Sequence, residues 1–217
     1  MYHYITDKEF LKRARGLCSN LVNQLVRRIN KDSFMTVEAH LVGSGARNLV
    51  TQNGEEPIDF DYNLCIISTN GLYIQDCRAI KEYIRKQLNV VLRENGWGDC
   101  MDSTTALTTQ KQWLKTGNRT AFSIDIAIVR ECESKWYRLV HKKTGDAKRD
   151  EYFWREAPKS QGLRKKVDKL KQHGFWLAVR EAYLKKKNMY LSRRDKNHPS
   201  FNVYIEAVHE IYHSKFH

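Results

Sequence analysis

The spacing of apolar residues predicts a long amphipathic helix at the start of the chain. Thr6-Asp7-Lys8-Glu9 has the pattern of a capping box, with Thr6 as the N-cap and Glu9 reaching back to it. Behind it, apolar residues recur every three or four positions as far as about Asn30, which indicates one buried helix face. The members of this face are Phe10, Leu11, Ala14, Leu17, Leu21, Leu25 and Ile29.

Extended and helical segments then alternate before the pattern becomes helical to the end. Strands are expected at 34–42, 59–67 and 122–129, with a weaker Thr-rich strand at 100–110 and a hairpin pairing 136–141 with 151–155. Further helices are expected at 75–94, 162–172, 175–187 and 202–213, with polar breaks at 185–188 and 192–199.

This order of elements predicts an α+β fold. We expect a mixed, mostly antiparallel sheet flanked by helices, followed by a C-terminal helical segment. In terms of domains, we expect a core over residues 1–158 and a helical segment over 159–217 that packs on it.

A glycine-rich turn followed by paired carboxylates is the first chemical feature. The strand that ends at Val42 runs into Gly43-Ser44-Gly45, and the strand at 59–67 opens with Asp59-Phe60-Asp61. Side chains at i and i+2 of a strand share a face, so we expect the two carboxylates side by side. Such a pair repels unless a cation neutralises it, and divalent metals prefer oxygen ligands. Alone, however, a Gly-Ser-Gly is usually only a turn, and an Asp-x-Asp is often a solvated strand end.

A third aspartate makes the combination more specific. Asp125 lies in the apolar strand 122–129, where an unpaired carboxylate is costly. If this strand neighbours the one carrying Asp59 and Asp61, the three carboxylates form a ligand set for two divalent ions, with Asp125 also a candidate base. Gly43 and Ser44 would hold phosphate, and Arg47 and Asn48 are expected at the start of a short helix or loop, where backbone N–H groups bind anions.

The composition limits the environment and the partners. The formal net charge is +13, and residues 142–196 carry 18 Lys and Arg against 7 Asp and Glu, so this segment holds most of the excess. Nucleotide phosphates, nucleic acid and simple solubility all fit such a surface. The five scattered cysteines indicate reduced thiols in a cytoplasmic protein. With no apolar run of about 18 residues and no secretory pattern at the N-terminus, we expect no membrane association.

Gly43-Ser44 followed by Asp59-Phe60-Asp61 and then Asp125 resembles the signature of the DNA polymerase β-like nucleotidyltransferase superfamily. The gap between Ser44 and Asp59 is similar to that in the branch of oligoadenylate synthases, cyclic GMP-AMP synthase and bacterial cyclic-oligonucleotide synthases. The resemblance implies a Gly-Ser turn that holds a triphosphate and three acidic residues that bind two magnesium ions.

The C-terminal part is also similar to that branch. Ser200-Phe201 at the start of a late helix resembles its Ser-Tyr pair, whose aromatic ring stacks on the nucleobase. The resemblance further implies that a lysine of the preceding helix meets phosphate, and Lys185 or Lys186 matches that position.

The leading hypothesis is therefore a nucleotidyltransferase that uses two Mg²⁺ or Mn²⁺ ions. It would transfer a nucleoside monophosphate from an NTP to a hydroxyl acceptor and release pyrophosphate. The alternative is a weakly active or inactive module of the same fold that binds nucleic acid or nucleotides through its basic helical segment. A structural partner in a toxin–antitoxin or defence complex would leave the aspartates unexplained. The acceptor stays open between a second nucleotide, RNA or another nucleic-acid end, a protein hydroxyl and a small molecule.

Overall fold

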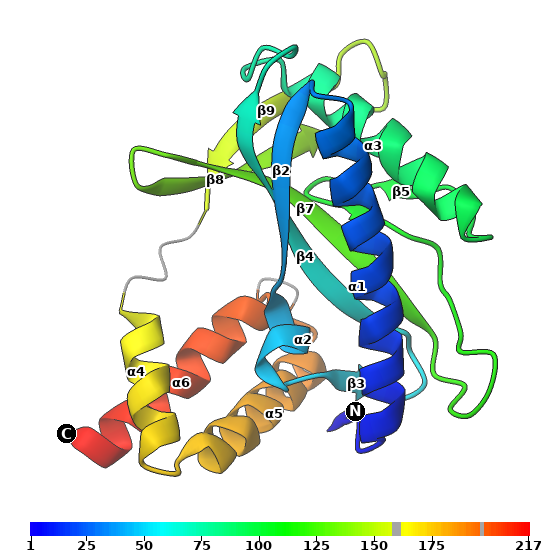
Figure 1. Cartoon of the computed structure of the whole chain (residues 1–217). Helices are drawn as coiled ribbons and strands as arrows, with labels where there is room; N and C mark the ends of the chain where they lie inside the picture. Colours follow the sequence, from blue (N-terminus) through cyan, green and yellow to red (C-terminus); the bar gives the residue numbers. More distant parts are fainter. Residues whose placement is uncertain (158–161, 196–197) are drawn as a thin grey trace. The chain divides into compact units, whose positions relative to one another are not determined.

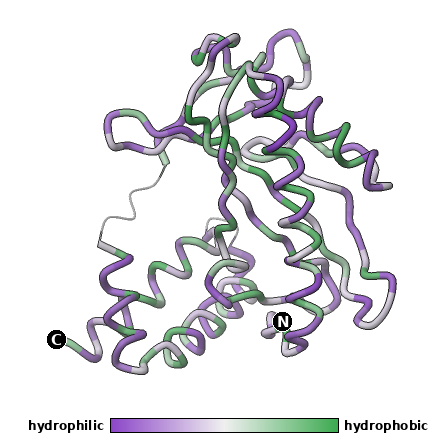
Figure 2. The backbone as a smooth tube through the Cα atoms, viewed as in Figure 1, coloured by the Kyte–Doolittle hydropathy of each residue, from purple (hydrophilic) through white to green (hydrophobic). Residues whose placement is uncertain are grey.

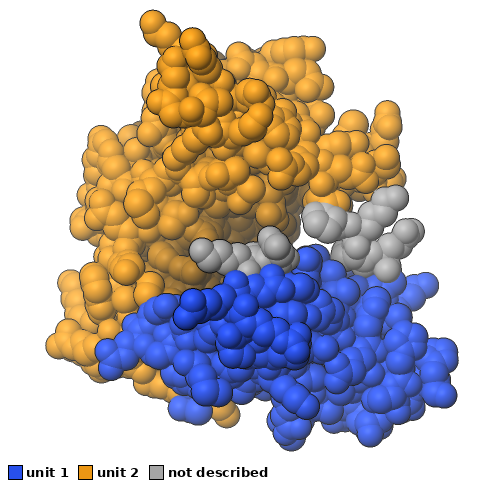
Figure 3. Space-filling view, turned by 180° about the vertical axis from the view of Figure 1, so that it is seen from behind, with its two compact units in different colours: residues 1–6, 49–56, 158–217 blue, residues 7–48, 57–157 orange. Residues whose placement is uncertain are grey.

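The computed structural model describes residues 1–157, 162–195 and 198–217, which form two compact units (Figures 1 and 3). The larger unit contains residues 7–48 and 57–157. The smaller unit combines residues 1–6 and 49–56 with the C-terminal part of the chain, 158–217. The domain boundary expected near residue 158 stays a prediction, because residues 158–161 lie outside the described ranges.

The two long helices of the larger unit begin at aspartate caps. In α1 (Lys8–Lys31), the Asp7 carboxylate accepts the Phe10 N–H at 2.9 Å, and in α3 (Cys77–Glu94) Asp76 accepts the Ala79 N–H at 2.9 Å. The capping box predicted with Thr6 as the N-cap is therefore wrong by one residue. Asp is at least as good an N-cap as Thr, and here it satisfies an N–H that would otherwise lack a partner.

A mixed, mostly antiparallel sheet forms the centre of the larger unit, as the sequence predicted. Its strands follow the order β2-β4-β7-β6-β5, and β8 pairs with both β7 and β9. Of the pairings described in this sheet, that of β4 with β7 is parallel and the others are antiparallel. The strands are β2 (Met35–Leu41), β4 (Ile58–Thr69), β5 (Met101–Asp102), β6 (Leu107–Thr108), β7 (Phe122–Cys132), β8 (Lys135–Lys142) and β9 (Glu151–Glu156).

The single strand expected over 100–110 is wrong. The segment forms two two-residue strands, β5 and β6, separated by a turn. Both the N–H and the hydroxyl of Ser103 donate to the Ala106 carbonyl, at 3.0 and 2.9 Å, and so close the turn in the middle of the segment. The Ser side chain thus competes with strand pairing for a backbone group.

The core of this unit lies between one face of the sheet and the helices α1 and α3 (Figure 1). Along α1, hydrophobic and hydrophilic residues alternate as expected for an amphipathic helix (Figure 2). The rings of Phe10, Phe60 and Trp97 pack edge-on around Phe122 at centroid distances of 6.3–6.4 Å. Because strand side chains alternate between faces, burying Phe60 and Phe122 directs Asp59, Asp61 and Asp125 to the opposite face.

A buried ionic network joins α3, β5 and β8. Lys81, whose side chain is 1 % exposed, makes an ion pair of 2.5 Å with Asp102 and donates to the Ser103 carbonyl at 2.8 Å. The imidazole of His141 lies between the carboxylates of Asp102 and Asp150, at 2.8 and 2.7 Å. Its ring stacks on Tyr152 at 4.1 Å. The network therefore ties the β8–β9 hairpin to α3.

The smaller unit consists of a short strand pair and three helices in its described residues. The helices are α4 (Leu163–Gln172), α5 (Trp176–Ser192) and α6 (Ser200–Phe216), and the strands are β1 (Tyr2–Tyr4) and β3 (Thr51–Asn53), paired antiparallel. The core of this unit contains Leu170, Val179, Tyr183, Ala207 and Val208.

The break expected at 185–188 is wrong, because α5 continues through it to Ser192. Asn188 anchors this part of the helix: its side chain accepts the Tyr2 N–H at 2.7 Å and donates to the Tyr2 carbonyl at 3.0 Å. Lys187 donates to the Thr51 hydroxyl at 2.9 Å. Lysine is a good helix former, and these contacts to β1 and β3 favour the helical conformation at Asn188.

No helix in the described residues is both long enough and apolar enough to cross a bilayer. All five cysteines are free; Cys132 is exposed and the other four are buried.

Replacing Lys81 by methionine removes the cation from the buried network and leaves the Asp102 carboxylate next to His141 with one partner fewer. We expect the free energy of unfolding to fall by about 3 kcal/mol, the usual range for a buried ion pair that loses one partner. Chemical denaturation measures it. Lys86→Met is the matched control, because Lys86 is exposed on the same helix. A loss no larger than in that control would contradict the role of the network.

Candidate active site

The parallel pairing of β4 with β7 brings the predicted carboxylates together. In its register Asp61 lies directly beside Asp125, and Asp59 lies beside Ser123. Directly paired residues on neighbouring strands share a face of the sheet. The strand that carries Asp125 is thus the neighbour of the strand that carries Asp59 and Asp61, which is the condition that the predicted metal site required. Asp59 is exposed, whereas Asp61 and Asp125 are half-buried.

Two hydroxyl groups hold two of the carboxylates. The Ser123 hydroxyl donates a short hydrogen bond to Asp59, and the Thr108 hydroxyl donates to Asp125 at 2.5 Å. Neither hydroxyl was among the predicted site residues. Strand alternation could have identified Ser123, which shares the Asp125 face. Thr108 could not be found in this way, because its position depends on the pairing of β6 with β7.

The three carboxylates interact electrostatically. Burial, followed by repulsion from Asp125 and Asp59, raises the pKa of Asp61 to about 6. Two arginines, Arg138 and Arg47, act in the opposite direction and lower this pKa. The pKa of Asp125 is also raised, first by burial and then by Asp59, against the lowering effect of the Thr108 hydrogen bond. The site is therefore a place where negative charge is costly and a cation would be stabilised.

Gly43 lets the chain pass unusually close to Asp61. Its φ of +63° lies in the left-handed region, and the Val42 N–H donates to the Asp61 carbonyl at 2.8 Å. A Cβ at Gly43 would lie 3.0 Å from the Asp61 Cγ and closer still to its Oδ2. Only glycine tolerates both the positive φ and the close approach that leaves no room for a Cβ. The backbone of Gly43 and Ser44 therefore lies beside the carboxylates.

Gly43 and Ser44 begin the one-turn helix α2 (Gly43–Arg47). Arg47 and Asn48, expected at the start of a short helix or loop, lie where α2 ends and the following loop begins. The Asn48 N–H donates to the Ser44 carbonyl, and the Arg47 guanidinium donates to the Gly43 carbonyl at 2.8 Å. Arg47 thus closes α2 and contributes positive charge near Asp61.

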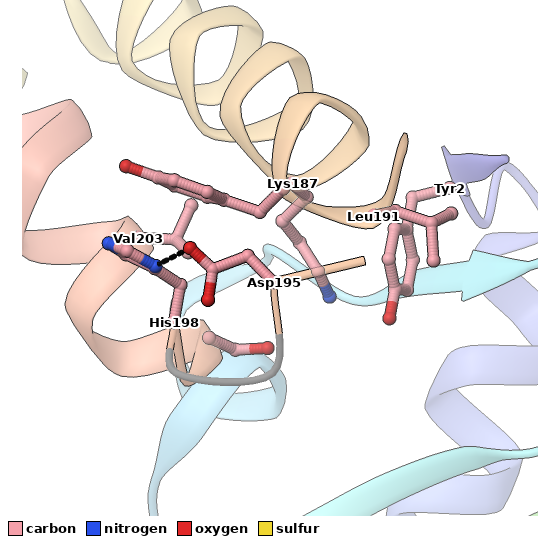
Figure 4. A pocket seen from close by; sticks show the side chains of 8 residues that line it. Tyr2, Lys187, Leu191, Asp195, His198 and Val203 are labelled. Carbon is pink, nitrogen blue, oxygen red and sulfur yellow. Dashed lines mark hydrogen bonds and ion pairs between the residues drawn. The ribbon is translucent and has the colours of Figure 1, made fainter. Parts of the chain in front are cut away.

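Three of the predicted nucleotide-binding residues, Lys185, Ser200 and Phe201, belong to the smaller unit, which also contains a cavity of about 110 Å³ (Figure 4). Ser200 lines this cavity, whereas Lys185 is exposed on α5 and Phe201 packs against the core of the unit. A lysine that does line the cavity is Lys187, whose Nζ lies 3.9 Å from the centre of the Tyr2 ring.

Acidic and imidazole side chains meet at the same cavity. His198 shares a hydrogen bond of 2.6 Å with Asp195 (Figure 4). Its ring stacks on Tyr190 at a centroid distance of 3.9 Å. Lys186, the other lysine considered for phosphate, instead pairs with Glu210 at 2.8 Å. The structure therefore places Lys187 and Ser200 together and leaves Lys185 and Lys186 outside the lining residues of this cavity.

The donor set of the acidic site is compatible with a divalent cation. Carboxylate oxygens are the ligands that Mg²⁺ and Mn²⁺ prefer, and the raised pKa of Asp61 shows how poorly the fold tolerates its charge without a counter-ion. In the described part of the chain, no group of three or more His, Cys, Asp or Glu side chains is already arranged to hold a metal ion. Two of the carboxylates are instead engaged by Ser123 and Thr108.

No protein-family model and no curated protein sequence matches the chain, but solved structures do. CdnC of E. coli MS115-1 with ATP superposes with a TM-score of 0.59 over 93 % of this chain and 59 % of that one, at 15 % identity. DncV cyclic AMP-GMP synthase of Vibrio cholerae, with the linear intermediate pppA(3′,5′)pG, gives 0.56 over 86 % and 48 %, at 14 % identity. The chain has the nucleotidyltransferase fold.

This fold is what the Gly-Ser turn and the aspartates predicted. The chain spans about half to three fifths of the length of these two structures. CdnC has also been solved with HORMA-deltaN, and that structure gives a TM-score of 0.55 at 15 % identity. At such identities the likeness establishes the nucleotidyltransferase fold alone.

Replacing Asp61 by asparagine should stabilise the metal-free protein at neutral pH. The folded-state pKa of Asp61 lies above its ordinary value, so ionised Asp61 destabilises the fold. This destabilisation is present above a pH of about 6 and disappears as the pH falls below that value, where the carboxyl is protonated. We expect a gain of ~2 kcal/mol in the free energy of unfolding at neutral pH and none at low pH.

Denaturation of both proteins across this pH range, with a chelator present, measures the difference. Asp99→Asn is the control, because Arg93 lowers the pKa of Asp99 and the same substitution there should not stabilise. A stability difference between Asp61→Asn and the parent that does not change with pH would refute the electrostatic explanation.

Gly43→Ala should lower the free energy of unfolding, measured by chemical denaturation, because the new Cβ collides with Asp61 in addition to the strain of a positive φ. Gly54→Ala is the matched control: its φ is +55°, and a Cβ added there would have no other atom within 4 Å. We expect Gly54→Ala to cost about 1 kcal/mol and Gly43→Ala clearly more. Equal losses would show that the close approach to Asp61 is unimportant.

Proposed function

We propose that the protein is a metal-dependent nucleotidyltransferase, which transfers a nucleoside monophosphate from an NTP to a hydroxyl acceptor and releases pyrophosphate. The observation that carries the proposal is the pairing of Asp61 with Asp125 on parallel strands, with Asp59 on the same face and the Gly43 backbone against Asp61. A site of this kind combines a cation-binding face with a backbone segment that can approach phosphate closely.

In this proposal Asp59, Asp61 and Asp125 would hold two divalent ions, Mg²⁺ or Mn²⁺. Bound ions would offset the charge of the triphosphate and polarise the phosphate that is attacked. The backbone and hydroxyl of Ser44, with Gly43, would orient the triphosphate, and Arg47 would add positive charge nearby. Ser123 and Thr108 would keep their carboxylates in place.

The reaction then requires a proton acceptor and a leaving group. The acceptor hydroxyl oxygen bonds to the α-phosphorus while the bond from that phosphorus to the bridging oxygen of pyrophosphate breaks. Asp125 is our candidate base for the hydroxyl proton, because its raised pKa brings its proton affinity closer to neutral pH. Ser200, Phe201 and Lys185 stay predicted residues of the nucleotide site, and Lys187 joins them as a lining residue of the same cavity as Ser200.

The bound ligands of the structural neighbours support an NTP as the donor. CdnC was solved with ATP, and DncV with a linear intermediate made of two nucleotides. For the present chain, these ligands favour an NTP substrate and make a second nucleotide one candidate acceptor.

The alternative function is nucleic-acid binding with little or no catalysis. Its specific support is the alternation of lysines and aromatic rings in the smaller unit, where the Lys169 Nζ lies 4.0 Å from the centre of the Phe216 ring and the Lys171 Nζ lies 4.7 Å from that of Trp176. Basic and aromatic side chains together suit single-stranded nucleic acid. The intact acidic site favours the enzyme.

Pyrophosphate release from each NTP with Mg²⁺ or Mn²⁺, with and without added RNA, tests the proposal. We expect release that needs the metal and falls to background in the double variant Asp59→Ala with Asp61→Ala. Asp146→Ala, an exposed acidic residue of the same unit, should leave it unchanged. Turnover unaffected by the double variant would overturn the proposal. Salt-dependent RNA binding without any turnover would favour the alternative.

A further inference from the structure

Three histidines recur along one side of α6. His209, His213 and His217 are spaced four residues apart, and all three are exposed. Because a helix completes a turn in about 3.6 residues, side chains at i and i+4 are neighbours on its surface. The His217 N–H donates to the His213 carbonyl at 3.1 Å, so the helical spacing extends to the third histidine. The second half of α6 therefore presents a row of imidazoles with His213 in the middle.

The separation of His213 from His217 agrees with two imidazoles on one metal ion. A zinc–nitrogen bond is about 2.0–2.1 Å long, which puts the ring centres of two imidazoles bound to the same ion roughly 5 Å apart. The ring centroids of His213 and His217 lie 5.0 Å apart. Those of His209 and His213 lie 6.3 Å apart and would have to approach each other. His213 and His217 are therefore the better pair for a metal site.

The position of this pair at the end of α6 also favours a cation. The carbonyl groups of the last turn of a helix carry partial negative charge, which stabilises cations there. Two lysines of α4 are directed to aromatic rings of α6: the Lys166 Nζ lies 5.1 Å from the centre of the Tyr212 ring, and the Lys169 Nζ lies 4.0 Å from that of Phe216. Consecutive residues of a helix point about 100° apart, so these ammonium groups lie to one side of the histidine row.

The first two histidines also belong to a motif of zinc enzymes. His209-Glu210-Ile211-Tyr212-His213 has the spacing His-Glu-x-x-His, which in zinc peptidases supplies two ligands and a glutamate base from one helix. In this chain the Glu210 carboxylate pairs with Lys186 of α5 at 2.8 Å. A carboxylate held by an ammonium group is a poor base, and two imidazoles are fewer protein ligands than a catalytic zinc site has. The arrangement therefore supports metal binding without hydrolysis.

We propose that His213 and His217 bind a divalent transition-metal ion, with water completing its coordination. Imidazole nitrogen suits Zn²⁺, Cu²⁺ and Ni²⁺, whereas Mg²⁺ prefers oxygen ligands, so this site selects differently from the acidic site. The bound ion would stabilise the last turn of α6, where Phe216 packs against His173 and Phe175. The inference does not rest on the proposed nucleotidyltransferase function.

Calorimetric titration with Zn²⁺ tests the site. The double variant Asp59→Ala with Asp61→Ala serves as the background, so that Zn²⁺ does not bind at the acidic site. We expect His213→Ala and His217→Ala each to lower the affinity at least about tenfold, because each removes one of the two ligands. His40→Ala is the matched control, because His40 is also exposed but lies on β2, and it should leave the affinity unchanged.

Two results of this titration would overturn the proposal. One is an affinity that neither His213→Ala nor His217→Ala lowers more than His40→Ala does. The other is a larger loss with His209→Ala than with His217→Ala, which would place the ion on the other pair of the row.

Two spectroscopic measurements on the same background give independent readouts. Electron paramagnetic resonance of bound Cu²⁺ should detect two ligating nitrogens, and one after His217→Ala. Zn²⁺ should slow hydrogen exchange of the amides in the last turn of α6, and this effect should disappear in His217→Ala. A single ligating nitrogen before any histidine is replaced, or exchange that does not respond to Zn²⁺, would overturn the site. None of these measurements requires nucleotide transfer, so their outcome is separate from that of the proposed function.

Discussion

The parallel pairing of β4 with β7 is the constraint on which the site depends. It sets Asp61 beside Asp125 and leaves Asp59 against Ser123 on the same face. The cost of this arrangement appears in the raised pKa of both Asp61 and Asp125. The same two strands place Phe60 and Phe122 in the core on the other face, and this burial stabilises a register that repulsion between the carboxylates alone would oppose.

Several neighbouring features accommodate this concentration of negative charge. The Thr108 and Ser123 hydroxyls donate to two of the carboxylates, and Arg47 and Arg138 lower the pKa of Asp61 from two different elements. None of these groups forms an ion pair with the carboxylates that would neutralise them within the described chain. Negative charge at the site is thus only partly compensated by the described residues, and such a site favours a cation.

The order of strands in the sheet also places different groups on different strands around the carboxylates. The Gly43 backbone approaches Asp61 from the β2 side, and the Arg138–Arg155 pair, whose two residues lie directly opposite each other, is on the β8–β9 side. The buried Lys81–Asp102–His141 network fixes the β8–β9 hairpin to α3 and so supports the position of that arginine pair.

The sequence by itself determined the features that depend on local periodicity. Alternation along two strands predicted that Asp59 and Asp61 share a face and that Asp125 lies opposite the isoleucines, and the amphipathic helices and the hairpin followed from spacing as well. Features decided by contacts between distant segments were missed or misplaced. Thr108 bonds to Asp125, and Arg138 lowers the pKa of Asp61, only because their strands pair with β7. In the same way, α5 continues past Lys185 because Asn188 bonds to Tyr2, far away in the chain. Side-chain period is a property of neighbouring residues, whereas register and anchoring are properties of the folded chain.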